Sequence, residues 1–332
     1  PSLAQFSPEM FFRFYFNSCT EFLVSIVASK EETEKSAAFN ALGMILSELP
    51  NPKLAETLIP KILAAINANL NNRKQFCFDS ITCLSQLSTA VSQNSSSIPL
   101  QVWDDLLPTI FLAGLNEQVT KAASILGRNI TGRTREIQIM LLQLLTYIIT
   151  KKPYTIHRIP ITDSREKTKE KNIEPNQKLL AAWSTIAIDE PLILLALKTL
   201  GSYGFEKELV LAFVRDVIVD FLDNDNIAIR KEAAITCANA IRPTEKKLSA
   251  FASSVIRQVF EKLLIVGIAD TDPTVRITVL ESFDETFDGY LAMAENLRSL
   301  FIALNDEIFD VRKLSIRMIG RLTLRNPACV MP

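Results

Sequence analysis

Apolar residues recur with the spacing of one helix face along almost the whole chain, and this periodicity restricts the fold more than any other feature. Between 205 and 222 they fall at i, i+3, i+4 and i+7 steps, and the pattern returns at 297–304 and 308–322. A stripe of this kind indicates a helix with a single buried side. Only 9 of the 332 residues are glycine, whereas average usage of about 7% would give roughly 23. We therefore expect helices joined by short turns.

Three of the expected turns carry the same short motif, in which an Asn or Asp is followed six residues later by an Arg. Each motif stands where one helix is expected to end and the next to begin. The spacing between motifs is close to the roughly 40–47-residue period of HEAT-type helix pairs. The three pairs are Asn224 with Arg230, Asp270 with Arg276, and Asp306 with Arg312.

We call these six residues the repeat ladder, because their chemistry predicts links between successive repeats. An Asp or Asn in the turn accepts hydrogen bonds from the free N–H groups that open the next helix, and its charge suits the positive end of that helix. An Arg one turn further on can reach a neighbouring carboxylate with its planar fork. We expect the three arginines to be largely buried, and truncation of one to Ala to cost about 1–3 kcal/mol.

One helix pair cannot bury its apolar side alone, so such pairs stack on one another. The sequence therefore predicts an all-α protein, an α-solenoid of antiparallel helix pairs (HEAT- or armadillo-like) with about seven repeats. We expect helical repeats over 1–151 and HEAT repeats over 177–332, separated by an insertion at 152–176. Because the chain starts at Pro1, and its last helix has an apolar side that needs a neighbour, we also expect a segment of a longer chain.

The periodicity is lost between 152 and 176, where Pro153, Pro160 and Pro175 interrupt a run of charged residues. This composition is typical of an exposed, mobile insertion. Limited proteolysis is therefore expected to cut the chain first within this stretch. Mass spectrometry of the first fragments checks this, and initial cleavage inside 206–324 would contradict the predicted organisation.

The overall charge excludes several classes of protein. The 36 basic and 37 acidic residues give a net charge of -1, which argues against a general nucleic-acid binder. No uncharged run reaches the roughly 18–20 residues of a membrane-spanning helix, and a secretory signal is absent. The five cysteines form no C-x-x-C pair, which favours reduced, buried thiols in the cytosol or nucleus.

The residues that usually carry catalysis or bind cofactors and metals are missing or scattered. His157 is the only histidine and lies within the insertion, where the orienting partners of a catalytic histidine are lacking. The acidic stretch 223–226 lacks the Gly and the Glu of a calcium loop. The letters of 287–289 resemble a kinase magnesium motif in the wrong order, so Gly289 is interpreted as a left-handed helix end. We predict no catalytic, cofactor-binding or metal-binding residue.

Longer stretches resemble the target-of-rapamycin (TOR) serine/threonine kinases in their amino-terminal HEAT region. The resemblance covers most of 32–332, is densest after about 190, and follows the order of the family. The stretches are LLIVGIADTDPTVR at 263–276, YLAMAENL at 290–297, FIALND at 301–306, SAAFNALG at 36–43 and ALKTLGSYGFE at 196–206.

The resemblance implies a segment of a large kinase that controls growth in response to nutrients. In that family the catalytic and rapamycin-binding domains lie far downstream, and none of their motifs stands in this sequence, so no catalytic residue is carried over. The family's amino-terminal solenoid docks accessory subunits of the raptor and rictor type and helps to build a dimeric complex. The resemblance implies a cytoplasmic location, with peripheral attachment to endomembranes or entry into the nucleus as further options.

Two other interpretations remain open from the sequence. The first is an unrelated HEAT adaptor, such as a phosphatase scaffold or a nuclear-transport receptor, which a downstream sequence without a kinase domain would establish. The second is an enzyme with unrecognised chemistry, which ATP turnover by the isolated segment would reveal.

Overall fold

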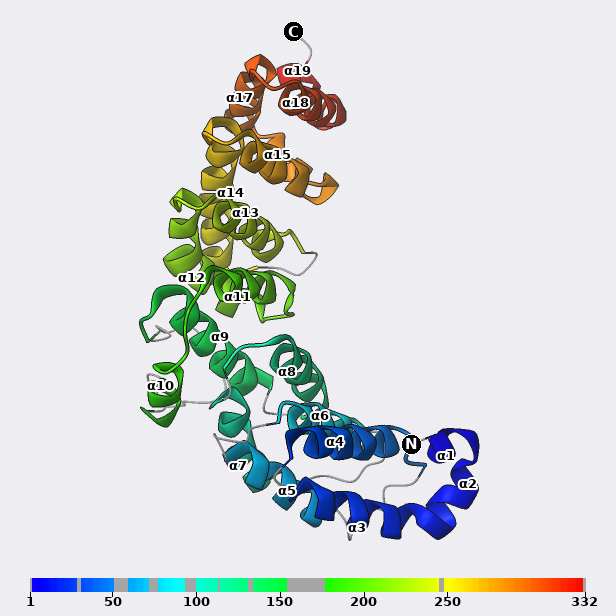
Figure 1. The fold of residues 1–332 in the computed structure, drawn as a ribbon. Coiled ribbons are helices and arrows are strands. Elements are labelled where there is room, and N and C mark those ends of the chain that lie inside the picture. Colours follow the sequence, from blue (N-terminus) through cyan, green and yellow to red (C-terminus); the bar gives the residue numbers. More distant parts are fainter. Residues whose placement is uncertain are drawn as a thin grey trace. The chain divides into compact units, whose positions relative to one another are not determined.

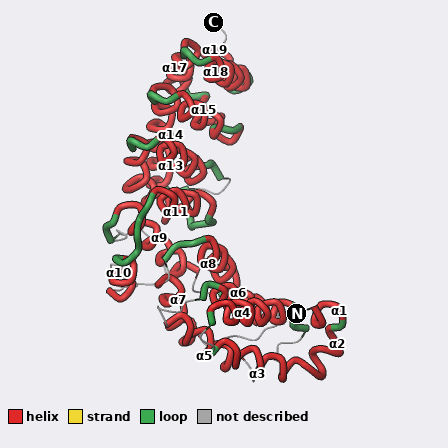
Figure 2. The backbone as a smooth tube through the Cα atoms, viewed as in Figure 1, coloured by secondary structure: helices red, strands yellow, loops and turns green. Residues whose placement is uncertain are grey.

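The computed structural model describes residues 2–28, 31–50, 59–71, 77–92, 100–112, 114–130, 134–153, 177–244 and 248–330. Within these ranges every regular element is a helix and no strand is present (Figure 2). The expected insertion at 152–176 lies outside the described residues except for Lys152 and Pro153, as does His157.

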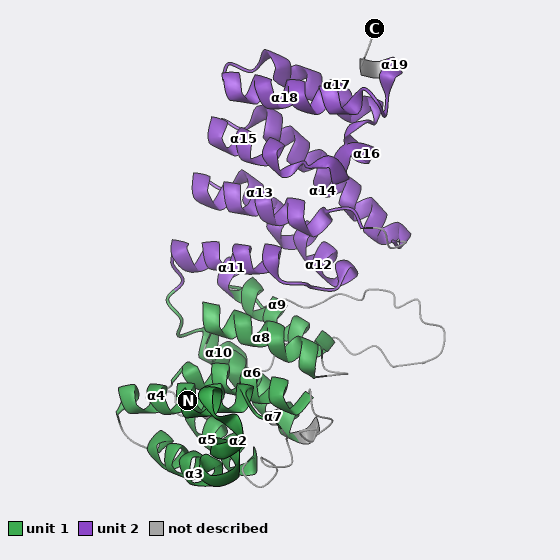
Figure 3. Cartoon of the chain, turned by 90° about the vertical axis from the view of Figure 1, so that its right-hand side faces the viewer, with its two compact units in different colours: residues 1–147, 151–156, 171–187 green, residues 148–150, 157–170, 188–332 purple. Residues whose placement is uncertain are grey.

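The chain divides into two compact units (Figure 3). Unit 1 comprises residues 1–147, 151–156 and 171–187, and unit 2 comprises residues 148–150, 157–170 and 188–332. The helices that begin in unit 1 are α1 Ser2–Phe6, α2 Pro8–Met10, the π-helix η1 Phe11–Tyr15, α3 Phe16–Val27, α4 Glu32–Ser47, α5 Ile59–Asn71, α6 Asp79–Ser92, α7 Leu100–Leu112, α8 Glu117–Asn129, α9 Thr134–Thr150 and α10 Gln177–Trp183.

Unit 1 is built from two layers of helices that pack pair by pair. In one layer α3 contacts α5 and α5 contacts α7, and in the other α4 packs on α6 and α6 on α8. The layers are joined because α3 packs on α4 and α5 on α6. Helix α10 returns to α7, where the buried indole of Trp183 donates a hydrogen bond of 2.7 Å to the carbonyl of Phe111 and lies 5.9 Å from the ring of Tyr147.

Unit 2 repeats the same two-layer arrangement (Figure 1). Its helices are α11 Glu190–Ser202, α12 Lys207–Phe213, the π-helix η3 Val214–Ile218, the 3-10 helix η4 Val219–Asp223, α13 Ile227–Ile241, α14 Ala250–Ala269, α15 Pro273–Ser282, the 3-10 helix η5 Glu285–Phe287, α16 Asp288–Leu291, α17 Ala294–Ile302, the 3-10 helix η6 Ala303–Asn305, α18 Phe309–Leu322 and α19 Pro327–Val330.

The first layer of unit 2 contains α12, α14 and α17, and the second layer contains α11, α13, α15 and α18. Each second-layer helix packs on the next one in this order, and α13, α15 and α18 also pack against the first-layer helices that precede them in the chain. The apolar sides are therefore buried between successive pairs, and the prediction of an all-α solenoid of antiparallel helix pairs is confirmed.

Two helical stretches of unit 2 are interrupted in the structure. The helix expected over 206–222 changes from α12 to the π-turn η3 and then to the 3-10 turn η4. A π-turn inserts extra backbone and so shifts the helical phase, which the apolar stripe alone does not reveal. Helix α15 ends at Ser282, and a separate short helix follows, because Asp284 accepts a hydrogen bond of 3.0 Å from the N–H of Thr286 and starts η5.

The interpretation of Gly289 as a left-handed helix end is wrong. Gly289 lies inside the short helix α16, and Gly114 is the described glycine with a positive φ, of 84°. The acidic residue in this stretch has a structural role instead, because Asp288 forms the ion pair with Arg321 that is described below.

Candidate functional site

The turn before α13 is held by two asparagine side chains, one of which binds the backbone of the other. Asn224 Oδ1 accepts a hydrogen bond of 2.9 Å from the N–H of Asn226. Asn226 Oδ1 in turn accepts from the N–H groups of Ala228 and Ile229, at 2.8 and 3.3 Å. Both accept from donors that have no intrahelical partner at a helix start. The turn therefore has one defined conformation from which Arg230 projects.

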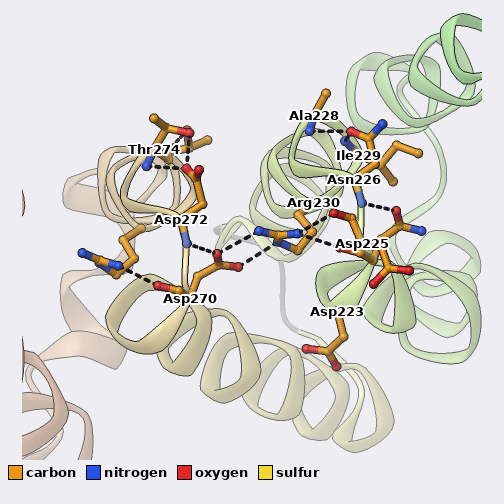
Figure 4. A network of polar contacts seen from close by, with 12 residues as sticks. Asp223, Asp225, Asn226, Ala228, Ile229, Arg230, Asp270, Asp272 and Thr274 are labelled. Carbon is orange, nitrogen blue, oxygen red and sulfur yellow. Dashed lines mark hydrogen bonds and ion pairs between the residues drawn. The ribbon is translucent and has the colours of Figure 1, made fainter.

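Arg230 forms the first rung of the ladder by binding two turns at once (Figure 4). Its Nε and Nη2 donate to the two carboxylate oxygens of Asp270, at 3.0 and 3.1 Å. Its Nη1 donates to the carbonyls of Asn224 and Asp225 in its own turn, at 2.7 and 3.2 Å. The Arg230 and Asp270 side chains are only 11% and 7% exposed. The paired fork thus links the turn before α13 to the turn before α15.

Arg276 forms the second rung with the same division of its donors. Its Nη1 donates to the carbonyl of Asp270 at 2.6 Å, and its Nη2 donates to Asp306 Oδ1 at 3.0 Å and to Glu307 Oε1 at 3.4 Å. The Nε lies 2.9 Å from Asp306 Oδ2 in an ion pair that lacks the alignment of a hydrogen bond. Both Arg276 and Asp306 are buried. This rung links the turns before α15 and α18.

Each ladder carboxylate performs two tasks. Asp270 Oδ1 accepts from the N–H of Asp272, and Asp306 Oδ1 accepts from the N–H of Ile308, both at 2.8 Å. The same carboxylates hold the arginine of the preceding repeat. The conformation of one turn is therefore coupled to the position of the repeat before it.

The two ends of the ladder differ from its middle. Arg312 Nη1 donates to the carbonyls of Asp306 and Glu307, at 2.6 and 3.0 Å, and its guanidinium lies 5.7 Å from the ring of Phe309. It is only half-buried, so the expected burial is not reached, and no carboxylate of the described residues pairs with it. Asn224, at the other end, is uncharged.

Unit 1 contains a related link, in which a carboxylate binds uncharged side chains. The sequence did not reveal this link. Asp79, at the start of α6, accepts from the hydroxyl of Ser36 at 2.5 Å and from the amide of Gln118 at 3.2 Å. These partners stand at the starts of α4 and α8, so one carboxylate connects three second-layer helices. Lys35 occupies the position four residues after the N-cap that arginine holds in unit 2, and it too is buried. The position of Lys35 is thus a signal for a repeat at α4, but it does not indicate the contacts of Asp79.

A second set of ion pairs in unit 2 involves arginines at the C-terminal ends of α13 and α18, away from the ladder. The sequence did not predict this set. Arg242, which follows α13, pairs with Asp284. Arg321 Nε donates to the buried carboxylate of Asp288 at 2.7 Å, and its Nη2 donates to the carbonyl of Phe283 at 3.1 Å. The pairing with Arg321 accounts for the acidic residue at position 288.

Acid is expected to weaken this second set of contacts. Burial alone would raise the pKa of the Asp284 carboxyl, but hydrogen bonds from Thr286 and the charge of Arg242 outweigh it and hold the pKa below its usual value. A depressed carboxyl pKa stabilises the fold above the unfolded pKa of about 4 and loses that contribution as pH falls through the lower folded value. Asp284→Asn should therefore lower the urea midpoint at pH 7 and leave it nearly unchanged at pH 2. Equal losses at both pH values would contradict this.

Two fully buried cysteines, Cys83 and Cys237, have the chemistry of core residues. Burial raises the pKa of the Cys83 thiol to about 12 and also raises that of Cys237. Both therefore remain protonated near neutral pH, whereas a nucleophilic cysteine must ionise. Among the described residues, no group of three or more His, Cys, Asp or Glu could hold a metal ion. Over the same residues, each helix is too short or too polar to cross a bilayer.

Comparison with solved structures defines the class of protein. The fold resembles importin β, with a TM-score of 0.59 over 96% of this chain and 37% of that chain, at 12% sequence identity. It also resembles Cex1p, with a TM-score of 0.53 over 92% of this chain and 53% of that chain, at 14% identity. The chain is thus a HEAT-type helical-repeat protein. At these identities the likeness concerns the fold alone.

Comparison with curated sequences finds similar proteins along the whole chain. The chain is 34% identical over its full length to the serine/threonine-protein kinase tor1 of Schizosaccharomyces pombe, 32% to mTor of Drosophila melanogaster and 27% to TOR of Arabidopsis thaliana. No protein-family model matches. These full-length matches are all to TOR kinases, as the resemblance predicted. The chain spans only 13–14% of the length of these relatives, and that portion is a helical-repeat region and not the kinase domain.

Proposed function

We propose that this segment is a non-catalytic scaffold of a TOR-type serine/threonine kinase, and that it docks accessory subunits of the raptor or rictor type in nutrient and growth signalling. The observation that carries the proposal is the match to TOR kinases along the whole chain. The same match disfavours an unrelated HEAT adaptor, because the likeness to importin β is limited to the fold.

The ladder supports this function by fixing the spacing of the turns. Buried rungs at Arg230 and Arg276 each tie one turn to the next through several hydrogen bonds. A partner that binds across successive repeats then meets a surface that is already ordered, which reduces the conformational entropy lost on binding. In this proposal the buried ladder contributes to docking through the geometry of the surface, without touching the partner itself.

The proposal extends to the setting of the segment. It acts without a cofactor, within a kinase complex that is dimeric when complete. It works in the cytoplasm, where the complete complex can attach peripherally to endomembranes.

Co-purification tests the docking role. The tagged segment, with its helical content checked by circular dichroism, is expected to retain a raptor-type or a rictor-type subunit, and an excess of it should compete with the full-length kinase for that subunit. The double variant Arg230→Ala, Arg276→Ala should retain less, while Lys313→Ala, an exposed charge in the same unit, should match the wild type. If both subunits bind the full-length kinase and neither binds the segment, the docking proposal is wrong.

A separate measurement addresses catalysis. The purified segment is expected to hydrolyse no ATP above the buffer blank, because it is a helical-repeat region and not the kinase domain. A coupled ATPase assay over a range of segment concentrations checks this. Hydrolysis that increases with segment concentration and survives repurification would support the enzyme alternative.

A further inference from the structure

A groove of about 520 Å³ opens in unit 1 between the end of α3, the start of α4 and one side of α5. This volume lies within the range of about 300–1,000 Å³ that is usual for small-molecule sites. Small apolar side chains form most of its wall, and these include Val24 and Val27 of α3 and Ala64, Ala65 and Ala68 of α5.

The groove exists because the two sides of α5 carry side chains of different size. Toward the core, Ile62 and Ile66 are fully buried. Toward the groove, the three alanines leave space beside the valines of α3. Such a wall suits an alkyl chain, and each methylene group that it buries is expected to tighten binding about fourfold.

Both charged side chains among the described residues of the lining are cations. Lys35, in the first turn of α4, is only 6% exposed. Lys61, near the start of α5, is more exposed, and its ammonium lies 2.6 Å from Oε1 of Glu21 on α3. An ammonium group beside an apolar wall attracts an anion more strongly than one in bulk water, because the local dielectric constant is lower. The groove therefore combines an apolar wall with positive charge.

We propose that this groove binds the anion of an alkyl carboxylic acid, with the carboxylate near Lys35 and Lys61 and the alkyl chain along the alanines of α5. Glu21 already supplies one negative charge beside Lys61, which favours a monoanion over a dianionic phosphate ester. The bound ligand contacts α3, α4 and α5 together, so it stabilises that end of unit 1 by mass action.

Photolabelling of the full-length chain tests the proposal, with a decanoic acid that carries a diazirine in its alkyl chain as the probe. Mass spectrometry should find the label within 24–28 and 64–69. Decanoate should compete with the probe, octanoate about tenfold less well because it is two methylene groups shorter, and decanol and decylamine only weakly.

Three outcomes of the labelling would overturn the proposal. The first is label found only outside the groove. The second is equal competition by decanol or decylamine, which would show that the positive charge has no part in binding. The third is stronger competition by decyl phosphate than by decanoate, which would assign the groove to a phosphate ester.

The two partners of the ion pair supply matched variants with opposite expected effects. Lys61→Gln removes a cation and should weaken competition by decanoate several-fold. Glu21→Gln removes the carboxylate that neutralises Lys61 and should strengthen it. Loss of a purely structural ion pair would move both variants in the same direction, and that result would contradict the proposal.

A change of shape without a change of charge completes the test. Ala65→Leu fills the groove and should abolish labelling of 24–28 and 64–69. Lys121→Gln, which removes an exposed cation elsewhere in unit 1, should label like the wild type. Undiminished labelling in Ala65→Leu would show that the alkyl chain does not lie in the groove.

Discussion

Arg276→Ala is expected to lower the free energy of unfolding by about 3–5 kcal/mol, because it removes one partner of a buried ion pair. This exceeds the loss of about 1–3 kcal/mol expected from the sequence, which considered unsatisfied hydrogen-bonding groups alone. The Arg276 and Asp306 side chains are 7% and 6% exposed. Without the guanidinium the Asp306 carboxylate keeps its contact to the N–H of Ile308 but loses its charged partner away from water. Urea denaturation of the segment, followed by circular dichroism, measures the effect.

The control for this prediction is Lys313→Ala, because Lys313 is an exposed cation in the same unit. Surface substitutions of this type usually change stability by less than about 0.5 kcal/mol. If Arg276→Ala and Lys313→Ala shift the urea midpoint equally, the second rung does not stabilise unit 2. An unchanged m-value is required for the comparison, since a change in m would report a different unfolding transition.

Trp183→Ala is expected to destabilise unit 1 by a similar amount, about 3–5 kcal/mol, because it empties the largest fully buried side-chain position. It also removes the hydrogen bond of 2.7 Å to the carbonyl of Phe111. That bond ties α10 to α7, so amide hydrogen exchange in 100–112 should accelerate together with exchange in 177–183.

Trp183→Phe separates the two contributions. The phenyl ring retains much of the buried apolar volume but cannot donate to Phe111, so its cost should be clearly smaller than that of Trp183→Ala. Accelerated exchange confined to 177–183 in Trp183→Ala would contradict the proposed tie, because α7 would then be independent of α10.

Local patterns in the sequence predicted most of the helical stretches of unit 2, and also that Arg230 and Arg276 would reach a neighbouring carboxylate. Asp270 and Asp306 belong to a repeated motif. In a stack of repeats each copy of the motif lies against the next copy, so the repetition indicates a contact between residues that are far apart in the sequence. The motif could not reveal that Arg312 is less buried than Arg276. The burial of each arginine depends on the residues that pack around it, and the six residues of the ladder do not determine that packing.

Other contacts had no repeated signature and were missed. Asp79 joins Ser36 and Gln118, but Ser, Asp and Gln are common at helix starts, so nothing in their types indicates that they meet. Asp288 and Arg321 are brought together by the packing of α16 against α18. The interruption of 206–222 by η3 was also invisible, since a π-turn depends on packing and not on the apolar stripe.

The central claim is that successive helix pairs are held together by direct links between neighbouring turns. A double-mutant cycle of Arg276→Ala and Asp306→Ala tests it most directly. The account predicts a coupling energy of about 1–3 kcal/mol, because residues in one ion-pair network are not additive, while Arg230→Ala with Asp306→Ala should be additive within about 0.5 kcal/mol. Additivity in the first cycle, or equal coupling in both, would contradict a stack built from nearest-neighbour rungs.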